Sequence, residues 1–118
     1  MAWNFTADKP IYIQIAEIIK RDILSGKYQA GDKLPTVRDL ASEAAVNPNT
    51  MQKAFSELEQ EGLISTQRTA GRTVTTDSNA LAEARELMLE ELTREYLRKM
   101  EQMGSTKEDA VRLINIAK

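Results

Sequence analysis

The chain has 118 residues and a formal net charge of −2, with 42% hydrophobic and 5% aromatic residues. This length suits one domain with a short appendage, and the scarcity of aromatic side chains favours packed helices over a β-sandwich. The sequence contains no cysteine and no histidine, which excludes disulfides, thiolate metal sites and the usual nucleophilic triads. We therefore expect no metal, no cofactor and no enzymatic activity.

Two further classes of protein are excluded by the distribution of apolar residues. No stretch reaches the ~18–20 consecutive apolar residues of a membrane span. The first five residues, Met-Ala-Trp-Asn-Phe, also lack the pattern of a signal peptide. The sequence thus favours a cytoplasmic protein without a membrane partner.

The first regular element is expected to be a helix from about residue 10 to residue 24. Its apolar side chains recur at the spacing of one helical face: Tyr12, Ile15, Ala16, Ile19 and Ile23. Gly26 ends this helix, and the turn signal Gly31-Asp32 indicates a short ordered connection up to residue 34.

A second helix is predicted to begin after Thr36, whose hydroxyl can cap it together with Asp39 three residues on. It ends near residue 45, and a third helix follows at once, because Asn47 is a good N-cap and Pro48 suits the first helical position. Two short helices joined by a turn of about three to four residues form a helix-turn-helix.

The third helix has one apolar and one polar face. Its buried stripe is expected to be Met51, Ala54, Phe55 and Leu58. The opposite face carries groups that can read base edges in a major groove: Asn49, Gln52, Lys53 and Ser56. The carboxylates of this helix lie only in its last turns, so its N-terminal half would enter the groove. A surface helix of a small α protein is the alternative explanation of this segment.

Two segments rich in β-branched residues, 63–66 and 73–76, predict a β-hairpin. The stretch between them, Arg68-Thr69-Ala70-Gly71-Arg72, reads as the tip of a wing. Two arginines flanking small residues suit a loop laid on phosphates or in a minor groove. Exposed hairpins also carry arginines for solubility.

Charge within this region is balanced. Residues 33–76 contain five bases, Lys33, Arg38, Lys53, Arg68 and Arg72, and five acids, Asp39, Glu43, Glu57, Glu59 and Glu61. The bases lie at helix starts and turns, while three of the acids crowd one helix end. A local positive face is therefore expected, but not a strong nonspecific field.

Several short motifs in fixed order resemble the winged helix-turn-helix of GntR-family transcription regulators. They are Tyr12-x-Gln14-Ile15-Ala16, the segment from Gly26 to Gly31, Leu34-Pro35-Thr36-x-Arg38-x-Leu40-Ala41, Val46-Asn47-Pro48-Asn49-Thr50, Ala54, Leu58-Glu59-x-x-Gly62-Leu63-Ile64 and Gly71-Arg72-Thr73-Val74. The resemblance covers about residues 10–76, and the Asn-Pro-Asn-Thr junction with the short C-terminal part is most similar to the YtrA-like branch. It implies a homodimer that binds a pseudo-palindromic operator.

The resemblance also implies roles for individual residues. Arg38 matches the second-helix arginine that contacts DNA, and Thr36 matches the capping residue. The same resemblance matches Asn47, Asn49, Thr50 and Gln52 to the recognition-helix contacts, and Arg68 and Thr69 to the wing. Together with the polar residues of the third helix and the wing arginines, the expected DNA-binding set is Thr36, Arg38, Asn47, Asn49, Thr50, Gln52, Lys53, Arg68, Thr69, Gly71 and Arg72. The chain departs from the family pattern at Pro48, where some branches carry a base-contacting arginine, and at Thr69, a wing position often held by glycine.

After residue 77 the pattern becomes that of two amphipathic helices. Ser78 can cap a long one, and Thr106 with Asp109 can cap a short final one. About forty residues cannot close a core of their own, so they must pack on the winged domain or on a second subunit. The residues expected to make the dimer are Leu81, Met88, Leu92, Tyr96, Met100 and Ile114.

The sequence therefore predicts a mainly α fold with a small β-hairpin: a winged helix-turn-helix over residues 1–77 and a helical dimerisation segment over residues 78–118. The predicted function is a sequence-specific transcriptional repressor with a double-stranded DNA operator as partner. The alternative is a winged-helix module for protein–protein contact without DNA binding, which the negative total charge favours. A hydrolase using Glu57 or Glu61 is the remote third. The sequence leaves open whether a small-molecule effector exists. The C-terminal segment is too short for a self-contained pocket, so such an effector would bind in an apolar crevice between two subunits.

Overall fold

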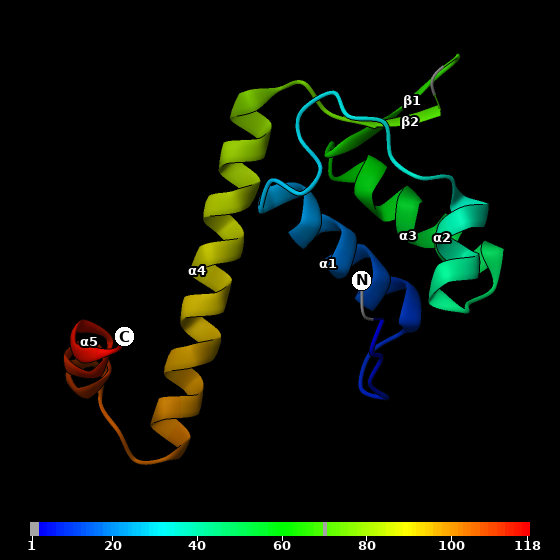
Figure 1. Cartoon of the computed structure of the whole chain (residues 1–118). Helices are drawn as coiled ribbons and strands as arrows, with labels where there is room; N and C mark the ends of the chain where they lie inside the picture. Colours follow the sequence, from blue (N-terminus) through cyan, green and yellow to red (C-terminus); the bar gives the residue numbers. More distant parts are fainter. Residues whose placement is uncertain (1–2, 70) are drawn as a thin grey trace. The chain divides into compact units, whose positions relative to one another are not determined.

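The computed structural model describes residues 3–69 and 71–118. The chain divides into two compact units, Met1–Ala82 and Glu83–Lys118. In chain order the elements are α1 (Ile11–Leu24), α2 (Val37–Ala44), α3 (Pro48–Gln60), β1 (Ile64–Gln67), β2 (Gly71–Val74), α4 (Ser78–Gln102) and α5 (Lys107–Ile116) (Figure 1). The predicted fold class, mainly α with one antiparallel hairpin, is confirmed.

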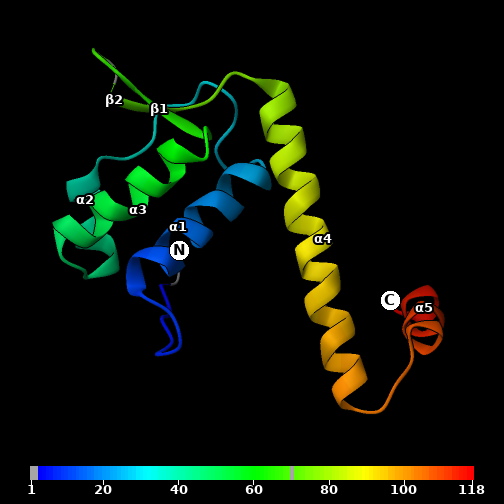
Figure 2. The same cartoon turned by 180° about the vertical axis from the view of Figure 1, so that it is seen from behind.

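The first unit has its core where α1, α2 and α3 meet. α1 and α3 lie side by side in both views, and α2 packs on α3 (Figures 1 and 2). The largest side chains of this core are at most 2% exposed: Phe55, Ile15, Ile19, Met51, Leu58, Leu63 and Val74. Burial of these apolar side chains is the main stabilising contribution and fixes the orientation of α3.

Side-chain caps start α2 and α3 as the sequence predicts. Thr36 Oγ1 accepts a hydrogen bond from Asp39 N at 3.0 Å, and Asn47 Oδ1 accepts one from Asn49 N at 2.7 Å. The turn between them passes through Ala45, whose φ of 57° is left-handed, before Val46 N donates to Ala41 O at 3.0 Å. These local bonds close a tight helix-turn-helix.

The strands of the wing reach closer to its tip than the sequence indicates. β1 pairs with β2 so that Ile64 faces Val74 and Gln67 faces Gly71, which places Gly71 and Arg72 within a strand and not at the tip. Segment 31–34 adds a third, short partner to β2: Leu34 N donates to Arg72 O at 2.9 Å, and Lys33 pairs with Thr73. The predicted tip also includes Ala70, which lies outside the described residues.

The hairpin register differs from the predicted strands for a local reason. Leu63, assigned to the first strand, is instead part of the turn that closes α3, because its N–H donates to Leu58 O at 3.1 Å. Gly62, with φ 77°, makes that closing turn. The strand therefore starts one residue later than the β-branched pattern suggested.

The helices after residue 77 also begin at side-chain caps. At α4 the capping oxygen is Asp77 Oδ1, which accepts from Asn79 N and Ala80 N at 3.0 and 3.1 Å. Ser78, the predicted cap, is instead the first helical residue. At α5 Thr106 Oγ1 accepts from Asp109 N at 3.1 Å, as predicted.

Candidate nucleic-acid interface

The helix α3 shows the two faces predicted for it. Met51, Ala54, Phe55 and Leu58 are each 0% exposed. On the other side Asn49, Gln52, Lys53 and Ser56 are exposed, while Thr50 is half-buried. Amide and hydroxyl groups thus line the free face of a helix whose position is fixed by its buried face, an arrangement suited to reading base edges.

Lys53 does not extend freely from this face. Its Nζ lies 4.7 Å from the centroid of the Tyr12 ring, on α1. A cation over an aromatic face at this distance is attracted by the ring quadrupole. The ammonium is therefore held beside the start of α1, and Tyr12, which the sequence placed only in an apolar stripe, becomes part of the polar surface.

Arg72 belongs to a cluster of three side-chain contacts that the sequence did not reveal. Its Nε donates to Glu59 Oε1 at 2.8 Å, the Thr66 hydroxyl donates to the same oxygen at 3.1 Å, and its guanidinium lies 5.2 Å from the Phe55 ring centroid. The cluster joins both wing strands to α3. Arg72, predicted to clamp a phosphate, thus has an internal carboxylate partner, and its contacts fix the wing relative to the helix.

The acidic end of α3 is largely neutralised by its neighbours. Glu61 Oε1 accepts from Lys20 Nζ of α1 at 2.9 Å, and Glu59 is paired with Arg72. Both pairs are partly exposed and contribute modestly to stability. Their electrostatic effect matters more, because they reduce the repulsion that this end of the helix would exert on a phosphate backbone.

Cations without a carboxylate partner are concentrated on the helix-turn-helix and the wing. In the described part of the first unit, Lys9, Lys20, Lys27 and Arg72 each lie within 4.0 Å of a carboxylate. The remaining cations of that part have no such partner: Arg21, Lys33, Arg38, Lys53 and Arg68. Four of these five lie between residues 33 and 68. Among the described residues of segment 33–76, the pairs leave four cations without a carboxylate partner and three carboxylates without a cation partner, Asp39, Glu43 and Glu57, so only a small positive excess remains there.

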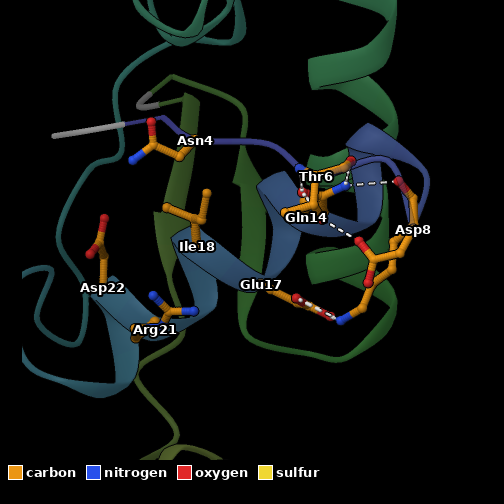
Figure 3. Close-up of a pocket in the computed structure, with 9 residues that line it drawn as sticks. Asn4, Thr6, Asp8, Gln14, Glu17, Ile18, Arg21 and Asp22 are labelled. Atoms are coloured by element: carbon orange, nitrogen blue, oxygen red, sulfur yellow. Dashed lines mark hydrogen bonds and ion pairs between the residues drawn. The ribbon is translucent and has the colours of Figure 1, made fainter.

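A polar hollow between the N-terminal segment and α1 has a different character (Figure 3). Gln14, 8% exposed, fastens the segment: its Oε1 accepts from Thr6 N, and its Nε2 donates to Thr6 O and Lys9 O, at 2.8–2.9 Å. The hydrogen bond from the Thr6 hydroxyl lowers the pKa of Asp8. This hollow contains no predicted DNA-binding residue, and its polar groups serve mainly to attach the segment.

The predicted dimerisation residues are divided between the units. Leu81 lies in the first unit, half-buried; Met88 and Met100 are half-buried in the second. Within the second unit Leu92, Tyr96 and Ile114 line one open apolar groove together with Leu89, Thr93, Leu113 and Ala117. Leu92 is 54% exposed and Ile114 58%. Three of the six predicted residues are thus brought together on one surface.

Two kinds of site are not found in the described residues. None of the helices there is both long and apolar enough to cross a membrane. Over the same residues, no group of three or more carboxylates is placed to hold a metal ion.

Comparison with known proteins identifies the fold and its use. The family model for bacterial regulatory proteins of the gntR family matches residues 11–74, from the start of α1 to the end of β2. The chain belongs to the GntR family. Its members are DNA-binding transcription regulators and not enzymes, so the expectation of a non-enzymatic regulator is confirmed by this membership.

Two relatives from Bacillus subtilis extend the likeness beyond the winged domain. The HTH-type regulator YhcF is 35% identical over 106 residues, 90% of this chain and 88% of the relative. The HTH-type transcriptional repressor YtrA is 40% identical over 89 residues, 75% of this chain and 68% of the relative. The resemblance to the YtrA-like branch is thereby confirmed.

Solved structures agree with this assignment. A GntR-family regulator from Listeria monocytogenes has a TM-score of 0.85 at 36% identity and covers 97% of this chain and 100% of its own. YtrA from Sulfolobus acidocaldarius, at 32% identity, has a TM-score of 0.60 and covers 98% and 93%. The DNA-binding domain of AraR in complex with operator ORR3, at 29% identity, has a TM-score of 0.55 and covers 64% and 88%.

Proposed function

We propose that this GntR-family regulator is a homodimeric repressor that binds a pseudo-palindromic operator. The polar face of α3 supports the mode of binding, and the name of the relative YtrA, a transcriptional repressor, supports the direction of control. The AraR complex supports operator DNA as the partner. A repressor of transcription acts where the chromosome is, so the proposed site of action is the cytoplasm.

The proposal of a dimer rests on one observation: the residues after 82 form no apolar core of their own. In Glu83–Lys118 only Ala110 is a buried apolar residue, although this unit contains leucines, isoleucines and methionines at helical spacing. A unit of this size cannot stabilise itself by burial within one copy. A second copy placed by two-fold symmetry would cover the groove of Leu92, Tyr96 and Ile114 with an identical groove. The domain division at residues 77 and 78 forms part of this proposal.

In the proposed complex the two protomers present α3 to successive major grooves. Asn49 and Gln52 read base edges with their amides, and Asn47 and Thr50 approach the DNA at the start of the helix. Arg38, Lys53, Arg68 and the hydroxyls of Thr36 and Thr69 contact the backbone, while Gly71 allows the wing to approach closely. We assign Arg72 mainly to holding the wing, because of its internal partners.

The test combines sedimentation equilibrium with a gel-shift titration on the DNA upstream of the chain's own gene. We expect a dimer at micromolar concentration and a retarded complex whose footprint shows two half-sites about 10–10.5 base pairs, or a multiple of this, apart. An unrelated duplex should bind far more weakly. A monomer that leaves upstream DNA unshifted in dilute buffer would refute the proposal and favour the protein-contact alternative.

The direction of control needs a separate measurement. A reporter under the upstream DNA should be expressed more strongly when the gene of the regulator is deleted, because a bound dimer excludes polymerase. Lower expression after deletion would instead identify an activator that uses the same binding mode.

A further inference from the structure

Lys33 occupies a rigid position at the base of the wing. The segment that carries it runs beside β2: Val74 N donates to Asp32 O at 2.9 Å and Leu34 N to Arg72 O at 2.9 Å (Figures 1 and 2). Successive side chains of an extended segment point to opposite sides. Leu34 enters the core at 3% exposed, whereas Lys33 is exposed.

The side chain of Lys33 lies against Gly71 of β2. Its Cε is 3.8 Å from the position that a Cβ on Gly71 would occupy. A small hollow at this place has polar groups from Lys33, Thr36 and Arg72 at its wall, and its other lining residues are Leu34, Pro35, Val37, Phe55 and Gly71. Lys33 has no carboxylate within 4.0 Å among the described residues, in contrast to Lys27 a few residues earlier, which pairs with Asp22 at 3.7 Å.

We propose that Lys33 is a further DNA contact, donating to one backbone phosphate seated at this hollow between the wing and α2. The inference rests on the proposed operator binding and adds a residue to it. A lysine ammonium is a compact point charge suited to a phosphate oxygen and gives no bidentate reading of a base. The Thr36 hydroxyl on the same wall can donate to a second oxygen. Arg72 also lines the hollow, but its charge is paired with Glu59, so Lys33 is the cation, among the described residues of the hollow, that is free to meet the phosphate.

The position of Lys33 predicts a phosphate contact that does not depend on the DNA sequence. Lys33 belongs neither to α3 nor to the tip of the wing, the two parts expected to meet base edges. Its loss should therefore weaken binding to every duplex by a similar factor, and it should reduce the number of counterions released when the complex forms.

The experiment compares the salt dependence of DNA binding by the full chain and by K33Q, on the upstream DNA and on an unrelated duplex of equal length. Each lost phosphate contact lowers the log–log slope by about 0.9, so a dimer that loses one per half-site should show a slope smaller by about 1.8. K27Q is the matched control, because Lys27 is exposed and already paired, and it should keep the wild-type slope. K33R should restore most of the slope.

The outcomes separate this inference from the proposed function. A smaller slope for K33Q at an unchanged melting temperature supports the phosphate contact. Two results would overturn the phosphate contact while operator binding stands. One is a wild-type slope for K33Q; the other is a loss of affinity with an unchanged slope and a lower melting temperature. A wild-type protein that binds neither duplex overturns the proposed function as well.

Discussion

The apolar groove of the second unit leads to a quantitative prediction about assembly. Leu92 lies in the groove and is 54% exposed. Burying a leucine side chain completely is worth about 1.5–3 kcal/mol, so covering the exposed half is worth about 0.8–1.6 kcal/mol. Two-fold symmetry counts this contribution twice. L92A should therefore weaken the dimer by about 1.6–3 kcal/mol, or about 15- to 150-fold in the dissociation constant.

Leu87 provides a matched control on the same helix. It is 63% exposed and does not line the groove, and it lies five residues from Leu92, on a different side of α4. L87A makes the same chemical change, with the same gain in helix propensity. It should leave the dissociation constant of the dimer within a factor of about 2–3, since an exposed leucine outside an interface contributes little.

Sedimentation equilibrium over a range of protein concentrations measures both dissociation constants directly. Circular dichroism on the same samples should show that both variants keep their helices. Equal weakening by L87A and L92A, or no effect of L92A, would refute the assignment of this groove to the dimer. DNA affinity should fall with L92A at low protein concentration and recover at high concentration, because the DNA-contacting surface itself is unchanged.

Three further predictions concern the winged domain. R38A should weaken binding to all DNA sequences alike, whereas Q52A should mainly relax the preference at one base pair, by about 1–3 kcal/mol. Competition titrations with single-base operator variants measure both effects, and equal losses for both variants on all sequences would contradict these roles. E59Q removes the carboxylate that holds Arg72 and should lower the free energy of unfolding by about 1 kcal/mol, a modest value because the pair is partly exposed. A urea titration measures this change, and an unchanged midpoint would show that the cluster does not hold the wing. A45G should raise the free energy of unfolding by about 0.5–1 kcal/mol, because Ala45 has a φ of 57°, which glycine adopts without steric cost. A lower free energy of unfolding for A45G would argue against this conformation of the turn.

Features determined by neighbouring residues could be read from the sequence. The caps at Thr36, Asn47 and Thr106 each depend on atoms two or three residues apart, and the structure contains all three. The buried stripe of α3 follows from helical periodicity in the same way. The DNA-binding roles of the exposed residues remain predictions, although the surface that carries them is the one expected.

Features that depend on residues distant in sequence were not predicted. Arg72 and Glu59 are thirteen residues apart, and only the hairpin register brings them to 2.8 Å. Lys53 meets Tyr12 because α1 packs on α3, and segment 31–34 pairs with β2, which lies far along the chain. No local pattern signals these contacts, since each requires two elements to be placed first.

The same long-range pairs explain how a chain of net charge −2 can bind DNA. A count over residues 33–76 gives five bases and five acids, which excludes a strong nonspecific field. The structure pairs Glu59 with Arg72 and pairs Glu61 with Lys20 from outside the segment, while Asp39, Glu43 and Glu57 have no cation partner in the described residues. Lys33, Arg38, Lys53 and Arg68 keep no carboxylate partner in the described part of the chain. Phosphate interactions fall off within about 10 Å at 0.1 M salt, so the local arrangement of charge governs binding more than the total does.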